Sequence, residues 1–163
     1  MLTFDKFVQE NSPFVLDYPV RDVRNDCKYY MVIVEPRCHP NFSFVCRTML
    51  RFTNDEWGLH VFHGNSNEHF VKTNLTGINV KYTKLDVDNL SIQEYNELLT
   101  SIWFHEQITS DKFLIFQTDS CLLKHGISDY MQYDYIGAPW PHRRNRVGNG
   151  GFSLRNKSKC MEV

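Results

Sequence analysis

Apolar residues in this chain form short dense runs separated by polar turns. The runs at the centre of the sequence are rich in β-branched and aromatic residues, which is typical of buried strands. One run, 78–85, alternates apolar and polar positions and predicts a strand near the edge of a sheet. The segments that predict strands are 29–37, 57–64, 78–85, 112–117 and 134–140.

Helical spacing separates these strands. Apolar residues three or four apart predict an amphipathic helix over 42–52, and 67–75 predicts a shorter one. The clearest helix is predicted over 91–108, because Ser91 and Glu94 match a capping box. Its expected buried face consists of Ile92, Tyr95, Leu98, Leu99, Ile102 and Trp103.

The alternation of strands and helices predicts the fold class. It favours an α/β domain with an open, mostly parallel sheet flanked by helices. A chain of 163 residues suits one such domain. We expect residues 1–28 to form an N-terminal arm, irregular or with a short helix, and residues 29–163 to form the α/β domain.

Charge and composition exclude several function classes. The 18 Lys and Arg residues balance the 19 Asp and Glu residues, which argues against a nucleic-acid-binding protein. No apolar run approaches the roughly 20 residues that a membrane-spanning helix needs. Five cysteines without a C-x-x-C pair indicate free thiols in a reducing compartment, so we expect a cytoplasmic location.

Polar clusters follow four of the predicted strands. They are Glu35-Pro36-Arg37, His63-Gly64-Asn65, Gln117-Thr118-Asp119-Ser120 and Asn149-Gly150-Gly151. In open α/β sheets, ligands lie beyond the carboxyl ends of the strands. A turn explains each cluster singly, whereas a shared ligand pocket explains why they occur at the same end of the sheet.

The run Thr118-Asp119-Ser120 is a candidate metal or ribose site. Mg²⁺ and Mn²⁺ prefer oxygen ligands and often use only one or two protein carboxylates together with substrate phosphates. The alternative is a structural turn in which Asp119 caps the segment that begins at 121.

Three further segments have both a functional and a structural interpretation. The glycines of 147–155 permit close approach to a ligand, but Asn-Gly also predicts a hairpin turn. In 134–140, Asp134 is a carboxylate at the start of a strand, and Trp140 is a flat apolar platform that suits a sugar. The alternative is that the Tyr, Ile and Trp residues of this run belong to the core. The basic cluster 142–146 is a solvated loop or a contact for phosphate or acceptor.

Six motifs in this order resemble a known family. They are EPRCHP, WGLHVFHGNSN, EYNELLTS, FLIFQTDSCLL, YDYIGAPW and VGNGGFSLR. The set resembles an uncharacterised family of glycosyltransferase-like proteins, catalogued as a domain of unknown function and known from bacteria, fungi and large DNA viruses. The resemblance runs from about Val32 to the last residue. If the source is viral, the location would be the host cytoplasm or the virion.

The resemblance implies a GT-A type domain that binds a nucleotide sugar with Mn²⁺ or Mg²⁺. The implied metal-binding acid is Asp119, in a run with one carboxylate where Asp-x-Asp is usual. The implied nucleotide contacts are Arg37, Asn65, Thr118 and Asp119, the implied sugar contacts are Trp140, Asn149, Gly150 and Gly151, and the implied catalytic acid near the acceptor is Asp134.

Two functions follow from this resemblance. The first is a glycosyltransferase that transfers a sugar from a nucleotide-sugar donor to an unknown acceptor, which is a glycan, a protein or a small molecule. Related domains continue beyond SLR, whereas eight residues follow Arg155 here, so we expect a domain that lacks its C-terminal part. The second function is therefore a truncated or inactive module that binds a nucleotide or sugar, or serves as a scaffold.

Overall fold

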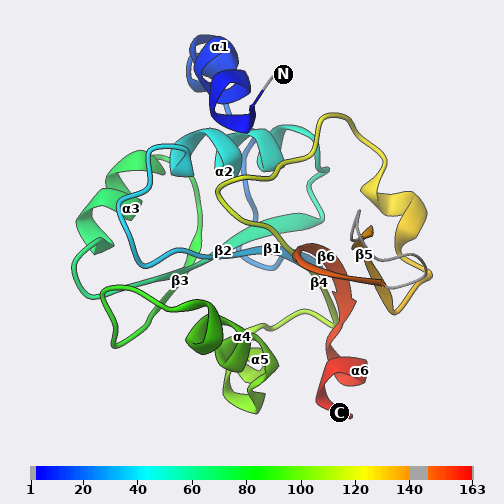
Figure 1. The fold of residues 1–163 in the computed structure, drawn as a ribbon. Helices are drawn as coiled ribbons and strands as arrows, with labels where there is room; N and C mark the ends of the chain where they lie inside the picture. The colour runs from blue at the N-terminus through cyan, green and yellow to red at the C-terminus, as the bar shows by residue number, and fades with distance from the viewer. Residues whose placement is uncertain (1–2, 140–146, 163) are drawn as a thin grey trace.

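A computed structural model describes residues 3–139 and 147–162. They form one α/β domain in which helices cover both faces of a six-stranded mixed sheet (Figure 1). The strand order is β3-β2-β1-β4-β6-β5. The strands are β1 (Tyr29–Val34), β2 (Trp57–His63), β3 (Lys81–Lys84), β4 (Lys112–Ile115), β5 (Tyr135–Pro139) and β6 (Val147–Asn156).

The first four strands are parallel, as the sequence predicts, and β3 lies at the edge. The last two strands differ, because β6 runs antiparallel to both β4 and β5. The chain moves from β1 outward through β2 to β3 and then returns to place β4 on the other side of β1. This reversal makes the gap between the carboxyl ends of β1 and β4 the topological switch point, where open α/β sheets bind ligands.

The helices divide between the two faces of the sheet. Figure 1 shows α1, α2 and α3 on one face and α4, α5 and α6 on the other. The described helices are α1 (Phe4–Leu16), α2 (Phe42–Arg51), α3 (Glu68–Asn74), α4 (Ile92–Thr100), α5 (Ile102–Gln107), the 3-10 helix η1 (Ile127–Tyr130) and α6 (Lys157–Met161). None of these helices is both long and apolar enough to cross a bilayer.

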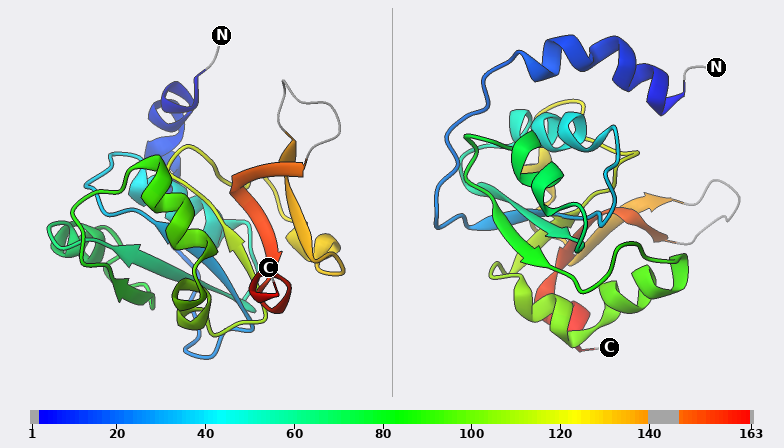
Figure 2. Two further views of the ribbon diagram at one scale, coloured as in Figure 1. Left: turned by 60° about the horizontal axis from the view of Figure 1, so that its bottom comes forward. Right: turned by 90° about the vertical axis from the view of Figure 1, so that its left-hand side faces the viewer.

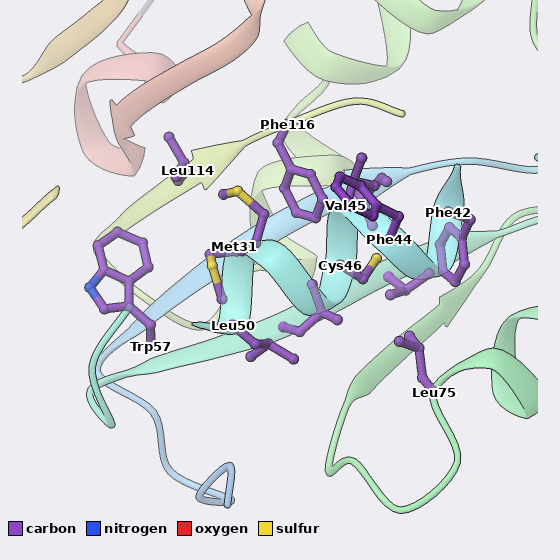
Figure 3. Packing of buried hydrophobic residues seen from close by; sticks show 14 of the residues in the cluster. Met31, Phe42, Phe44, Val45, Cys46, Leu50, Trp57, Leu75, Leu114 and Phe116 are labelled. Carbon is purple, nitrogen blue, oxygen red and sulfur yellow. The ribbon is translucent and has the colours of Figure 1, made fainter. Parts of the chain in front are cut away.

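Alternate residues of β1 enter two separate cores. Met31 and Ile33 pack in the core beneath α1, α2 and α3, part of which Figure 3 shows. Val32 and Val34 pack in the core beneath α4 and α5. Because both faces are covered, β1 is apolar at every position, and this pattern is typical of a central parallel strand.

The predicted helix 91–108 is wrong in one respect, because Ser101 divides it into α4 and α5. The Ser101 hydroxyl donates to the carbonyl of Leu98 at 2.8 Å and accepts from the amide of Phe104 at 3.2 Å. It therefore ends one helix and caps the next. Three residues of the expected buried face are exposed, namely Ile92 (84%), Ile102 (63%) and Trp103 (43%). The Ser91–Glu94 capping box is confirmed.

The glycine-rich segment is a strand rather than a hairpin turn. Among the described residues, only Gly77 and Gly126 are glycines with positive φ. In β6 the register against β5 jumps from Ser153 opposite Gly137 to Asn149 opposite Ala138. Residues 150–152 therefore form a bulge beyond the end of β4.

The N-terminal arm contains the regular helix α1, which packs across α2 (Figure 2). The Thr3 hydroxyl caps this helix by accepting from the amide of Lys6 at 3.3 Å. Phe7 anchors it, with its ring 5.9 Å from that of Phe44 in an edge-on arrangement. All five cysteines are free.

Candidate functional site

A cavity of about 770 Å³ opens at the carboxyl ends of β1 and β4. Its walls come from the loops after these strands, the start of α4 and the bulge of β6. Six of the predicted site residues line it, namely Arg37, Thr118, Asp119, Asn149, Gly150 and Gly151. The sequence predicts that four polar clusters share one pocket. Three of them line this cavity, whereas His63-Gly64-Asn65 does not.

An ion pair forms the β1 side of the cavity. Glu35 is 3% exposed, and its carboxylate accepts from Arg37 Nε at 2.8 Å and Nη2 at 2.9 Å. The backbone amide of Arg37 donates to the same carboxylate at 3.0 Å. These hydrogen bonds to Glu35 raise the pKa of the Arg37 guanidinium. The pair fixes the loop, and the exposed part of Arg37 presents N–H donors to the cavity.

Asn67 holds this loop against the loop that follows β2. Its side-chain amide donates to the carbonyls of Glu35 at 2.8 Å and Arg37 at 2.9 Å. Its side-chain oxygen accepts from the amide of Gly64 at 2.8 Å. Asn67 is fully buried, so these three bonds satisfy groups that water does not reach.

The segment after β4 is a turn and also a wall of the cavity. The amide of Ser120 donates to the carbonyl of Gln117 at 3.2 Å, and the Ser120 hydroxyl bonds back to Gln117. Asn41 supports the turn by donating to the carbonyl of Thr118 at 3.3 Å. The hydroxyl of Ser120 is therefore used inside the protein. Asp119 is exposed at the turn and forms no ion pair with another described residue.

The bulge of β6 forms the third wall. Arg155 donates from Nε to the Ser153 hydroxyl at 3.0 Å and from Nη2 to the Gly150 carbonyl at 3.2 Å. Side-chain oxygen Oδ1 of Asn149 accepts from the amide of Gly151 at 3.0 Å. A Cβ at Gly151 would lie 2.3 Å from Oε1 of Gln117, so the absence of a side chain lets the bulge approach the β4 turn.

Two further side chains line the cavity. Burial raises the pKa of the Tyr95 phenol, with the charges of Glu35 and Asp119 adding to this effect, so its hydroxyl is neutral near pH 7. His39 Nδ1 lies 3.2 Å from the donating amide of Asn41. Neutral His39 therefore carries its proton on Nε2 and is a donor there.

Three predicted site residues do not join this group. Asn65 is exposed, and its side chain donates to Asp86 at 3.0 Å. The side chain of Asp134 accepts a hydrogen bond from Asn156, which pairs with Lys112, the first residue of β4. Asp134 therefore lies at the opposite end of the sheet from the cavity. It does not line the cavity, contrary to the position beside a ligand that the resemblance implies. Trp140 and the basic cluster 142–146 lie outside the described residues.

Sequence reasoning missed Tyr95, His39 and Arg155 as cavity residues. Tyr95 follows the apolar spacing of its helix, which suggested core packing, and the start of α4 reaches the cavity only because of the crossover. Arg155 gave a usable signal. It is the last residue of the motif VGNGGFSLR, and its long side chain reaches back along the strand to the Gly150 carbonyl.

The family model described as "Protein of unknown function (DUF5672)" matches residues 78–163. The chain belongs to this family. No curated protein matches the chain. The DUF5672 match begins just before β3, whereas the motif resemblance began near Val32. It includes the cavity residues of α4, the β4 turn and the β6 bulge, but not the Glu35–Arg37 pair.

Proposed function

We propose that this DUF5672 protein is a glycosyltransferase of GT-A type that uses a nucleotide-sugar donor and a divalent metal ion. The observation that supports this most directly is the composition of the cavity at the switch point. It combines Asp119, which pairs with no described cation, with Arg155 and with the glycine backbone of the β6 bulge. A diphosphate with a divalent cation needs this mixture of negative and positive groups.

Each wall has a part in the proposed binding. Arg37 and Arg155 would oppose the charge of the diphosphate. Asn149 uses its oxygen on Gly151 and retains its NH₂ group as a donor for a sugar hydroxyl. Asp119 would hold Mn²⁺ or Mg²⁺ together with diphosphate oxygens, and the ion would neutralise the departing nucleoside diphosphate. One carboxylate is enough for such a jointly held ion.

The transfer joins the acceptor oxygen to the anomeric carbon and breaks the bond from that carbon to the diphosphate. The nucleoside diphosphate leaves with the electron pair, and the acceptor hydroxyl gives its proton to a base. Among the described cavity residues, Glu35 is paired with Arg37, and His39 Nδ1 accepts from Asn41. This shortage of free bases favours the second candidate function, a module that binds the donor without turnover.

Thermal unfolding with a panel of nucleotide sugars, each with and without Mn²⁺, tests the proposal. A ligand present at about 100 times its Kd stabilises the folded state by about 2.7 kcal/mol. For a chain of this length, that corresponds to a rise in Tm of about 5–10 °C. We expect one donor to produce this rise in a Mn²⁺-dependent manner, and Asp119→Asn to abolish the Mn²⁺ dependence.

Asp111→Asn is the matched control, because Asp111 is exposed at the amino end of β4 and far from the cavity. It should keep the full response. The absence of any Mn²⁺-dependent rise in the wild type, or equal responses of the two variants, would reject the proposal. Hydrolysis of the bound donor, measured by release of nucleoside diphosphate, then separates the transferase from the binding module.

A further inference from the structure

A second hollow of about 390 Å³ adjoins the cavity, and the two share Asp119. Its walls come from three segments that are distant in sequence. These are the start of α1, the stretch after the β4 turn and the β6 bulge. Figure 1 shows α1 on the same side of the sheet as the stretch that leaves β4. A ligand that lies across both spaces would therefore pass Asp119.

The second hollow is apolar except at the end formed by Asp119. Its apolar walls are Phe4, Phe7, Cys121, Leu123 and Phe152. Burial raises the pKa of the Cys121 thiol to about 11, so this side chain stays neutral near pH 7. The hydroxyls of Thr3 and Ser120 also line the hollow, but both bond to nearby backbone amides.

Leu123 is an exposed apolar side chain at the edge of the second hollow. It is 67% exposed, although it lies between two hollows with largely apolar walls. A third hollow of about 490 Å³ continues on its other side, with Leu122, Ile127 and Ile136 in its walls. An apolar group that covered Leu123 would remove this exposed surface from water.

We propose that this apolar hollow binds the apolar part of the acceptor. The acceptor is then a hydroxyl compound that carries an alkyl or aryl group. The inference rests on the proposed function. The polar end of the acceptor would lie beside Asp119, next to the sugar of the donor, and its apolar group would lie against Leu123 and Phe152. A purely polar acceptor would leave these side chains in contact with water.

The test compares binding of hexyl β-D-glucopyranoside and methyl β-D-glucopyranoside to the intact chain by NMR titration. Burial of the longer alkyl group should make the hexyl compound bind about tenfold tighter or better. Its signal changes should centre on the amides of 121–123 and 152. Leu123→Gln should weaken hexyl binding about fivefold, since it places a polar amide in the hollow.

Leu16→Gln is the matched control, because Leu16 is 44% exposed at the far end of α1 and lines neither hollow. Equal affinity for the two glucosides, or equal effects of the two variants, would overturn the inference. Nucleotide-sugar binding is measured in the same samples. If the hexyl glucoside binds in a Leu123-dependent manner but no nucleotide sugar binds, the glycosyltransferase proposal is overturned and the apolar site is supported. If a nucleotide sugar binds but hexyl binding does not depend on Leu123, the apolar site alone is overturned.

Discussion

Replacement of Asn67 by alanine should destabilise the protein strongly. The substitution removes three hydrogen bonds of 2.8–2.9 Å from a residue that is fully buried. At about 1 kcal/mol for each bond, together with about 1–3 kcal/mol for an unpaired Gly64 amide, the expected loss in the free energy of unfolding is about 4–6 kcal/mol. The loop that carries Arg37 also loses its anchor, so we expect weaker ligand binding.

Urea denaturation at 25 °C measures this loss as a lower midpoint with an unchanged slope. Asn65→Ala is a matched control in the same loop, because the exposed Asn65 bonds only to the side chain of Asp86 and to backbone. It should cost less than about 0.5 kcal/mol. Similar losses for the two variants would refute the view that Asn67 joins the loops after β1 and β2.

Three further predictions concern other sites. Burial lowers the pKa of His60 from 6.5 to about 3, so the unfolded chain binds a proton that the folded protein does not. The free energy of unfolding should therefore fall as the pH drops from about 6.5 toward 3, by up to about 1.4 kcal/mol per pH unit. Urea titrations at pH 7 and pH 5 measure this fall, which should be smaller in His60→Gln. Cys46 is fully buried, which raises its pKa, so thiol labelling followed by mass spectrometry should modify the exposed Cys38 in the native protein and Cys46 only after unfolding. Gly151→Ala should push the flexible Gln117 side chain aside and weaken nucleotide-sugar binding in calorimetry, at a stability cost of about 1 kcal/mol or less; unchanged binding would contradict the cavity geometry.

The central strands and their directions were predictable from the sequence. A strand such as β1, apolar at every position, has few alternatives to a place in the middle of a sheet with both faces covered. The convergence of Arg37 and Asp119 followed from the same reasoning, because parallel strands bring their carboxyl ends to one edge.

The antiparallel part of the sheet was less predictable. The Asn-Gly pair at 149–150 is typical of a turn, but pairing with β4 and β5 keeps it within the bulged strand β6. The strand directions then place Asp134 at the opposite end of the sheet from the cavity. Asn67 gave no local signal either, since its role depends on two loops that meet only in the folded protein.

Paramagnetic broadening by Mn²⁺ in the presence of a nucleotide-sugar donor tests the central claim most directly. If the cavity between β1 and β4 holds a metal and a diphosphate, the amide signals of 117–119 and 149–151 should broaden first. The amides of Asn65 and Asp134, which lie outside the cavity, should stay sharp. Broadening around either of these residues, with the signals of 117–119 unaffected, would contradict the account.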